Sequence, residues 1–457
     1  MISIALKFPY QQDSAGLFEQ FADQPWSAFL DSGQPHGEQG RYDILAAQPS
    51  KTLITRGAVT GIRDRGVLTL STKDPFLLLQ EALGPTREAP DGIPFCGGAI
   101  GYFGYDLARR LERLPSLAVD DAGVPDMAVA VYDWALLVDH ERQRSWLVGA
   151  EGENLHARKK QLLAARATSV NRFGSFHTSG PILCNIAHPD HIQGIERIQR
   201  YIHEGDCYQV NFARRFSVAC KGEPWLAYQR LRRLNPAPFG AYLNTPGCQV
   251  LSSSPERFLQ CRAGAVETRP IKGTCPRGLT PEQDHRLAEV LQNSSKDRAE
   301  NLMIVDLMRN DLGKVCAAGS IAVPELFKLE SFSRVHHLVS TVRGRLAQDQ
   351  TALTLLRACF PGGSITGAPK LRAMQIIEEL EPHRRGVYCG AIGYIGFDGA
   401  MDTNIAIRTL QHSNGVIRFC AGGGIVADSD PAAEYQETYH KASALLDLLQ
   451  QMRRGKR

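Results

Sequence analysis

The chain has 457 residues, of which 43% are hydrophobic and 22% are charged, and its 52 Lys and Arg residues outnumber its 48 Asp and Glu residues. This composition is typical of a globular protein and excludes a disordered chain, a collagen and a coiled coil. A net charge of +4 on so long a chain gives no argument for nucleic-acid binding.

The cysteines and the first residues predict a cytoplasmic protein. The 11 cysteines are scattered without a C-x-x-C pair, which is typical of reduced, buried thiols and not of a disulfide framework or a zinc site. Residues 1–10 lack the basic start and apolar core of a signal peptide. No apolar run approaches the roughly 18 residues that a membrane-spanning helix needs.

Strands and loops are predicted for residues 1–165. Residues 127–139 are rich in Val, Leu, Tyr and Trp, which predicts one buried strand, and 151–165 predict a short helix. Residues 166–189 carry Ser, Thr, Gly and Pro without a helical period, so we expect a linker there. It would separate the N-terminal region from a second domain at 190–447.

Helical periods become frequent after the linker. Isoleucines recur at helical spacing over 192–202, and residues 207–216 then predict a strand. Apolar residues over 287–291 and 303–307 predict two further helices, with Ser295 available as a cap between them. Asp430 followed by proline predicts the start of the last helix.

One internal similarity links the two regions. Gly98-Ala-Ile-Gly-Tyr-Phe-Gly-Tyr-Asp106 resembles Gly390-Ala-Ile-Gly-Tyr-Ile-Gly-Phe-Asp398. The glycine spacing is not that of a dinucleotide-binding loop. Either these are two unrelated glycine-rich strands, or they mark related halves whose sheets approach each other closely.

Lys272, in the segment Pro-Ile-Lys-Gly-Thr, has two interpretations. It is either a solvated surface lysine or a desolvated lysine whose lowered pKa leaves a nucleophilic amine. The neighbouring Arg269 and Arg277 would lower the pKa of Lys272 further.

Carboxylates from two separate helices form a second candidate feature. Glu300 lies near the start of one predicted helix, and Glu434, Glu437 and Lys441 share a face of the last one. Such faces are either simply solvated or suited to Mg²⁺, which prefers oxygen ligands.

Two glycine-rich segments could present backbone amides to an anion. Residues 361–370 precede a predicted helix but fail the P-loop pattern, and residues 421–426 follow Arg408, which could pair with a carboxylate.

Taken together, these motifs resemble the chorismate-utilising enzymes, a family that includes anthranilate, isochorismate and salicylate synthases. The resemblance runs through 187–447 and reaches into the N-terminal region. The segments that carry it are 205–211, 254–258, 297–311, 336–340, 361–370 and 434–438, with 30–33, 41–43 and 98–106 in the N-terminal region.

Two positions point to one branch of that family. Gln209 stands where isochorismate and salicylate synthases have a water-activating lysine, and Lys272 stands where anthranilate synthases have alanine. The resemblance therefore implies conversion of chorismate and ammonia to 4-amino-4-deoxychorismate, on the route to 4-aminobenzoate and folate. It implies that Lys272 attacks ring carbon C2, that Glu256 protonates the departing C4 hydroxyl, and that ammonia then displaces the lysine.

The same resemblance implies the rest of the site. Mg²⁺ would be held by Glu300 and Glu437, with Glu434 acting through water. The substrate contacts that it implies are Arg408, Tyr394, Thr366, His337, Gly422, Gly423, Gly424, Lys441 and Gln209. A tryptophan pocket known in relatives would be formed by Ser32, Asp43, Tyr208, Asn211, Pro238 and Phe239, although Asp31 replaces the usual glutamate of that region.

The chain has no Gly-x-Cys-x-Gly nucleophile motif, so the resemblance implies a separate glutaminase subunit as the source of ammonia. The implied fold is mixed α/β: two antiparallel sheets packed as a sandwich, helices outside, and the site in a cleft between lobes. Two alternatives stay open, an anthranilate synthase component and a catalytically silent regulator that binds tryptophan or chorismate.

Overall fold

The computed structural model describes residues 3–34, 36–37, 39–150, 154–167, 173–331 and 335–453. Their strands form two twelve-stranded sheets in which neighbouring strands run antiparallel. Both sheets contain strands from the N-terminal region and from the region beyond residue 190.

The spatial order of the strands differs from their order in the chain. From one edge to the other, the first sheet consists of β1 (Ser3–Phe8), β10 (Arg144–Ala150), β9 (Trp134–Asp139), β3 (Tyr42–Ala46), β2 (Ser27–Asp31), β13 (Phe239–Thr245), β14 (Cys248–Ser254), β23 (Thr409–Ser413), β24 (Val416–Ile425), β12 (Gln209–Gly222) and β11 (Phe176–Cys184), with β20 (Gly367–Ala368) beside β12. The second consists of β17 (Ile271–Pro276), β19 (Val335–Arg345), β16 (Ala265–Thr268), β15 (Arg257–Arg262), β22 (Met401–Ile405), β21 (Ala391–Gly396), β7 (Gly98–Phe103), β8 (Met127–Tyr132), β4 (Lys51–Arg56), β5 (Val59–Asp64) and β6 (Val67–Ser71), with β18 (Ala322–Ser331) beside β19.

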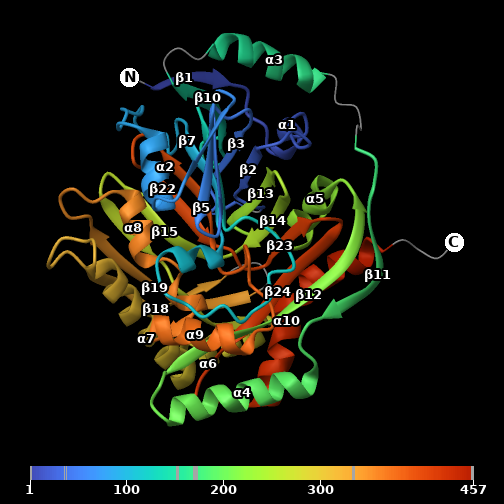
Figure 1. Ribbon diagram of the computed structural model, residues 1–457, viewed down its shortest axis with the longest axis vertical. Helices are drawn as coiled ribbons and strands as arrows, with labels where there is room; N and C mark the ends of the chain where they lie inside the picture. Colours follow the sequence, from blue (N-terminus) through green and yellow to red (C-terminus); the bar gives the residue numbers. More distant parts are fainter. Residues whose placement is uncertain are drawn as a thin grey trace.

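Helices cover the outer faces of the two sheets (Figure 1). The α-helices are α1 (Ala15–Phe18), α2 (Pro75–Leu83), α3 (Leu155–Ala167), α4 (His188–His203), α5 (Pro224–Leu234), α6 (Pro281–Asn293), α7 (Ser295–Gly313), α8 (Ala352–Cys359), α9 (Lys370–Leu380) and α10 (Pro431–Gln451), and the 3₁₀ turns are η1 (Tyr105–Arg110) and η2 (Gly363–Ile365). Helices α2, α7 and α8 pack on the second sheet, and α1, α3, α5 and α10 pack on the first.

A third core fills the space between the sheets. It contains side chains of both, such as Ile44 and Leu137 from the first and Ile100 and Ile392 from the second. Because side chains alternate along a strand, each central strand fills this inner core with one face and a helix-covered core with the other. The predicted two-sheet sandwich with outer helices is therefore confirmed.

The single strand predicted for residues 127–139 was wrong. The segment is two strands, β8 and β9, which lie in different sheets and are separated by Asp133 alone. The chain crosses from one sheet to the other at this residue. The same crossing recurs between β14 and β15 and between β22 and β23, and Glu256 and Arg408 lie in those two connections.

The predicted helices are confirmed, with corrections at their ends. Helix α10 begins at Pro431 with Asp430 as its cap, as expected, and α4 extends over His188–His203. The cap of α7 is Ser294, whose hydroxyl accepts a hydrogen bond from the Asp297 amide, and not Ser295. Within the range 166–189, residues 168–172 lie outside the described residues, and β11 occupies Phe176–Cys184. The division into an N-terminal region and a 190–447 domain stays a prediction.

The two similar glycine segments are neighbouring strands of one sheet. Gly98 lies opposite Gly396 and Gly101 opposite Gly393 in the β7–β21 pair. Gly98 has a φ of +135°, and a Cβ atom on it would lie 2.3 Å from the Ile395 carbonyl oxygen. Glycine relieves crowding between two backbones, as the second interpretation predicted, but the two backbones are neighbours within one sheet and do not belong to two sheets that approach each other.

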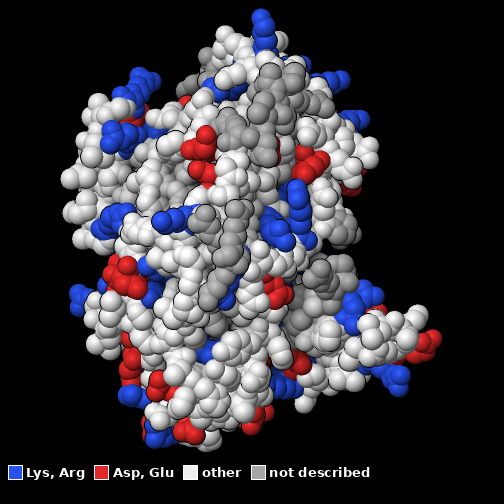
Figure 2. All heavy atoms as spheres, turned by 90° about the vertical axis from the view of Figure 1, so that its right-hand side faces the viewer, with Lys and Arg blue, Asp and Glu red and all other residues white. Residues whose placement is uncertain are grey.

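Acidic and basic side chains are interspersed on the face drawn in Figure 2, and no patch of one sign extends across it. In the described part of the chain, no helix has both the length and the apolar character required to cross a lipid bilayer.

Candidate active site

Glu256 and Lys272 meet at Ser364. Glu256 lies in the β14–β15 crossing, Lys272 in β17 and Ser364 in η2. The Ser364 hydroxyl donates to Glu256 Oε1 at 2.8 Å, and Lys272 Nζ donates to the Ser364 carbonyl oxygen at 3.3 Å. A carboxyl group and an amine that come from different strands therefore share one contact residue.

Burial sets the protonation of both groups. It raises the pKa of the Glu256 carboxyl to about 7, although the hydrogen bond from Ser364 acts in the opposite direction. Burial lowers the pKa of Lys272, and the Lys441 ammonium lowers it further, against the opposing effect of Glu300. Burial thus favours the protonated carboxyl of Glu256 near neutral pH and shifts Lys272 towards its neutral amine.

The cation that assists burial at Lys272 is not the one predicted from the sequence. Arg269 forms an ion pair with Glu330, and Arg277 pairs with Asp284 at 2.7 Å. Neither arginine is among the main influences on the pKa of Lys272. The spacing of residues along β17 suggested them, but their side chains turn to carboxylates elsewhere.

Carboxylates from α7 and α10 gather beside Lys272. The charge of Glu437 (α10) raises the pKa of Glu300 (α7), and the charges of both carboxylates act to raise the pKa of Lys272. Glycine at position 423 of β24 leaves room for the α10 carboxylates, because a Cβ atom there would lie 2.9 Å from Glu434 Oε2 and 3.7 Å from Glu437 Oε1. The predicted acidic residues of two separate helices therefore face a single place in the structure.

Lysines balance the charge of these carboxylates. Lys441 Nζ lies 2.5 Å from Glu437 Oε1 and donates to the Gly422 carbonyl oxygen at 3.1 Å. Burial would raise the pKa of Glu437, but Lys441 outweighs it and the pKa is lowered. Burial raises the pKa of both Glu300 and Glu434, and Ser429 donates to Glu434 Oε1 at 2.7 Å.

The donor set fits a magnesium ion that shares its ligands with a substrate. Within the described residues, no three His, Cys, Asp or Glu side chains are grouped closely enough to hold a metal by themselves. Mg²⁺ needs no such group, because it commonly takes one or two protein carboxylates and completes its shell with water and anionic substrate oxygens. Glu300 and Glu437 can supply those two carboxylates.

Other predicted contacts adjoin the same place. Gln209 Nε2 lies so close to Gly424 that a Cβ atom there would be 1.8 Å away. Thr366 follows Ser364 in the same loop, and its carbonyl oxygen accepts from the Asn211 amide. The side chain of Gln209 is buried, and its Oε1 has no partner among the described residues.

His337 and Arg408 extend the site along β17. His337 Nδ1 lies 2.8 Å from the hydroxyl of Thr274, two residues after Lys272. Burial, assisted by the positive charge of Arg408, lowers the pKa of His337 to about 4, so its imidazole is neutral at neutral pH. Arg408 has a left-handed φ of 49°, and its Nη1 donates to Asn235 Oδ1 at 3.5 Å. It forms no ion pair with a described carboxylate, so its guanidinium could pair with a substrate anion.

Tyr394 lies elsewhere. Its side chain is part of the core between the sheets, where its ring centre is 5.1 Å from that of Phe95. It also lines a cavity of about 380 Å³. Side chains alternate along β21, and position 394 faces this inner core and not Glu256.

The six residues predicted for tryptophan are divided among three places. Pro238 and Phe239 line the same cavity as Tyr394, together with Asp31. Tyr208 is 71% exposed, and its amide donates to the carbonyl oxygen of Ala368, while the amide of Asn211 donates to that of Thr366 in the loop that contains Ser364. Ser32 and Asp43 belong to a third group.

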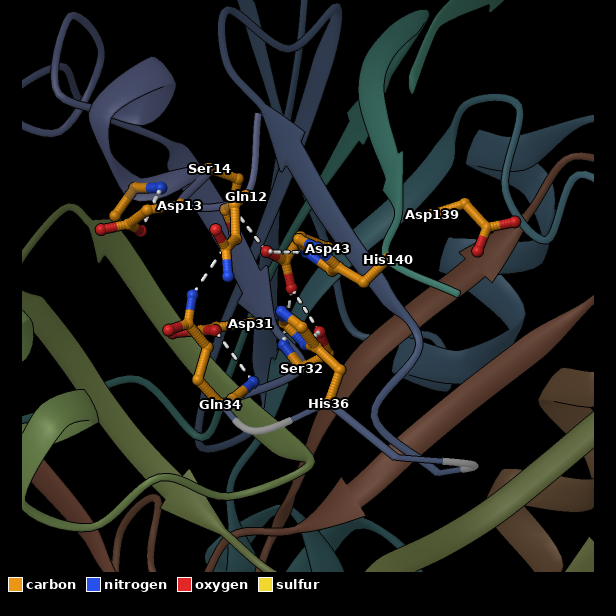
Figure 3. Close-up of polar contacts among 12 residues, drawn as sticks. Gln12, Asp13, Ser14, Asp31, Ser32, Gln34, His36, Asp43, Asp139 and His140 are labelled. Carbon is orange, nitrogen blue, oxygen red and sulfur yellow. Dashed lines mark hydrogen bonds and ion pairs between the residues drawn. The ribbon is translucent and has the colours of Figure 1, made fainter. Parts of the chain in front are cut away.

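That third group is a buried hydrogen-bond network centred on Asp43, drawn in Figure 3. Asp43 accepts from the hydroxyls of Ser14 and Ser32 at 2.5 and 2.6 Å, and from His140 Nε2 at 2.8 Å. Burial alone would raise the pKa of Asp43, but His140 and the hydroxyls lower it to about 2. The network ties the N-terminal loop to β2 and β3.

Two residues of the site were missed in the sequence. Ser364 contacts both Glu256 and Lys272, and Lys296 Nζ lies 4.0 Å from Glu434 Oε1. Ser364 lies inside the motif segment 361–370, and Lys296 directly precedes the segment 297–311. Nothing in a serine or lysine of such a segment indicates a contact with a residue more than 90 positions away.

Comparisons with known proteins agree on one family. The model of the chorismate binding enzyme family matches residues 27–447. Aminodeoxychorismate synthase component 1 of Klebsiella aerogenes is 48% identical over 98% of this chain and 100% of that protein. The protein of the same name from Escherichia coli (strain K12) is 47% identical over 96% of this chain and 97% of that protein.

A solved structure agrees with these matches. Anthranilate synthase component I from Streptococcus pneumoniae TIGR4 is 34% identical, with a TM-score of 0.78 over 90% of this chain and 94% of that chain. The two chains share a fold, which confirms the fold that the sequence motifs implied.

Proposed function

The chain belongs to the chorismate-binding enzyme family, and we propose that the reaction at its site is the amination of chorismate at C4. The two relatives that share nearly half of its residues are aminodeoxychorismate synthases. This chain is accordingly a chorismate-utilising enzyme that forms 4-amino-4-deoxychorismate. The observation that carries the proposal is a buried lysine amine and a buried carboxyl group that share a contact with Ser364.

Lys272 acts as the nucleophile. Its neutral amine forms a bond from Nζ to ring carbon C2, the two ring double bonds each shift by one position, and the C4–O bond breaks. Glu256 donates its proton to the departing hydroxyl, which leaves as water. A pKa of about 7 keeps Glu256 protonated at the start of the cycle.

Ammonia completes the cycle. Its nitrogen forms a bond to C4, the double bonds shift back, and the C2–Nζ bond breaks, so that Lys272 departs as a neutral amine. The proton that the new ammonium group loses returns to the Glu256 carboxylate. The sum is chorismate and ammonia giving 4-amino-4-deoxychorismate and water, with both residues restored.

Glu300 and Glu437 would hold Mg²⁺, assisted by Glu434 through water. When bound, the ion would neutralise the ring carboxylate and fix its register. Arg408, which lacks a carboxylate partner among the described residues, would bind the second carboxylate of the substrate, and the amides of Gly422–Gly424 would face the same group.

Product analysis tests the proposal against anthranilate synthesis. The purified chain is incubated with chorismate, Mg²⁺ and an ammonium salt, and products are separated by chromatography and identified by mass. We expect 4-amino-4-deoxychorismate without release of pyruvate. Anthranilate as the main product, seen by its fluorescence, would favour the anthranilate synthase alternative, and no turnover would favour the silent regulator.

Partner and regulator complete the proposal. A separate glutaminase subunit supplies ammonia, in keeping with the component 1 name of the relatives.

Tryptophan would occupy the 380 Å³ cavity lined by Asp31, Pro238 and Phe239, whose size suits an amino acid. Calorimetric titration with tryptophan tests this, and a Phe239→Ala variant that binds as well as the parent would contradict it.

A further inference from the structure

Arg214 of β12 carries a buried positive charge without an ion pair. Its side chain is 1% exposed, and no described carboxylate pairs with it. Instead, its Nε and Nη2 both donate to the hydroxyl oxygen of Thr438, at 3.1 and 2.6 Å. The guanidinium carbon lies 4.0 Å from the ring centre of Tyr435 and 4.5 Å from that of Tyr439. Burying a charge is costly, so its contacts need an explanation.

All three contact residues lie on α10, the helix that carries two of the predicted metal-site carboxylates. Thr438 directly follows Glu437, and Tyr435 directly follows Glu434. Successive residues of a helix are about 100° apart, so the Arg214 contacts and the carboxylates occupy adjacent faces. A rotation of α10 about its axis that separates Thr438 from Arg214 would therefore move Glu437 as well.

Arg214 also fixes α10 relative to the glycine segment. In the β12–β24 pair Arg214 lies opposite Ala421, next to Gly422–Gly424. Figure 1 shows α10 beside these two strands. The planar fork of a guanidinium can bond a hydroxyl and stack on aromatic rings at the same time, which a lysine ammonium cannot reproduce.

We propose that Arg214 is a positioning residue that sets the rotation of α10, and through it the placement of the Glu437 carboxylate opposite Glu300. The proposal rests on the assignment of Glu300 and Glu437 as metal ligands under the proposed function. Residues that orient metal ligands from outside typically change metal affinity by 10- to 100-fold when they are mutated.

The test measures binding of Mn²⁺ alone, by titration calorimetry and by electron paramagnetic resonance, on the full chain without chorismate. Arg214→Lys keeps the charge but loses the double contact, and Thr438→Val removes the acceptor at nearly constant volume. We expect each to weaken Mn²⁺ binding by about tenfold. If Arg214→Lys fails to fold, Thr438→Val still tests the proposal.

Arg215→Lys is the matched control. Arg215 is the next residue on β12, so its side chain points to the opposite face, where it forms a bidentate pair with Asp121 at 2.6 and 2.8 Å. We expect this variant to bind Mn²⁺ as the parent does. Equal Mn²⁺ affinity of Arg214→Lys, Thr438→Val and Arg215→Lys would overturn the proposal.

Glu437→Gln separates this proposal from the one on which it rests. If Glu437→Gln abolishes Mn²⁺ binding and Thr438→Val leaves it unchanged, the ligands are right and the role of Arg214 is wrong. If the parent chain binds Mn²⁺ no better than Glu437→Gln does, both without chorismate and with chorismate added, the metal assignment itself fails, and the inference about Arg214 fails with it.

Discussion

At the scale of single residues, burial changes the acidity of Glu256. Its folded-state pKa of about 7 lies above the ordinary value of 4.5, because burial penalises the carboxylate. The folded protein therefore binds more protons than the unfolded chain between these two values, and this group's contribution to stability is lost as pH rises through the folded pKa. The same shift keeps a proton available for catalysis near neutral pH.

The first prediction concerns Ser364, whose hydroxyl stabilises the ionised form of Glu256. With free ammonia held constant, kcat should fall as pH rises past about 7, because the general acid loses its proton. Ser364→Ala removes a hydrogen bond that lowers the pKa of Glu256, so its falling limb should move to higher pH. The readout is the pH profile of 4-amino-4-deoxychorismate formation.

Ser320→Ala serves as the control, because the hydrogen bonds of the Ser320 hydroxyl among the described residues are with Ala317 and Arg345, and neither belongs to the active site. Its falling limb should coincide with that of the parent. A Ser364→Ala limb at the parent position would show that this hydroxyl does not control Glu256.

The second prediction concerns Lys272. Chorismate added without ammonia should leave an adduct on the protein whose mass equals dehydrated chorismate, and Lys272→Ala should lose it. The variant should keep some turnover through direct attack of ammonia at C2, so that some anthranilate forms. Intact-protein mass spectrometry gives the first result and product fluorescence the second.

Lys328→Ala, a change of an exposed lysine that pairs with Glu325, should retain the adduct. An unmodified parent protein, together with 4-amino-4-deoxychorismate formation by Lys272→Ala at the parent rate, would leave Lys272 only an electrostatic or structural role.

At the scale of elements, the site depends on two helices that pack on different sheets and are joined by the ion pair between Lys296 and Glu434. The third prediction is that Glu300→Gln on α7 and Glu437→Gln on α10 each reduce Mg²⁺-dependent turnover by at least 10²-fold, because each removes one of the charged oxygen ligands. Turnover is measured over a range of Mg²⁺ concentrations. Glu289→Gln on α6, an exposed residue paired with His285, should behave as the parent. Full activity of either ligand variant with a chelator present would disprove the metal role.

A buried ion pair at the end of α9 joins two further elements, η2 and β12. Arg385 and Glu381 are both buried and lie 2.6 Å apart, and Arg385 donates to the carbonyl oxygens of Ile365 and Asn211. The pair thus connects the Ser364 loop to β12. Arg385 and Glu381 are distant from Glu256 in the sequence, but Arg385 binds the loop whose Ser364 contacts Glu256.

The fourth prediction follows from this pair. Glu381→Gln leaves a buried guanidinium without a counter-charge and should lower the free energy of unfolding by about 3–5 kcal/mol. The double change Glu381→Leu with Arg385→Met should cost less, because no unpaired charge remains. Urea unfolding measures both. A double variant less stable than Glu381→Gln would contradict the electrostatic explanation.

The helices could be predicted because their signals are local. Asp430-Pro431 begins α10, and the isoleucine period identifies α4. The boundary between β8 and β9 could not be predicted, because all residues of both strands are buried and nothing in the alternation shows a change of sheet. The positions of Tyr394 and Ser364 could not be predicted for a similar reason. The sheet face on which Tyr394 lies and the distant residues that Ser364 contacts both depend on which strands become neighbours.

At the scale of the whole molecule, the proposed function assigns the supply of ammonia to a separate glutaminase subunit. The fifth prediction is that ammonium salts support turnover by the purified chain and that glutamine alone does not, because the sequence contains no glutaminase nucleophile motif. Product formation is compared with equal nitrogen from either source, and a glutaminase component added to the glutamine reaction should restore turnover. Efficient use of glutamine by this chain alone would disprove the prediction.

The interleaving of strands from both ends of the chain has a consequence for synthesis. Strand β7 takes β21 as a neighbour, and β21 leaves the ribosome nearly 300 residues after it. At about 5–20 residues per second, the edge of β7 waits roughly 15 to 60 s for that neighbour. The glycine-rich edge of β7, like the edge of β2 that later receives β13, is meanwhile open to pairing with another nascent chain. Each sheet can therefore be completed only after its C-terminal strands have been synthesised.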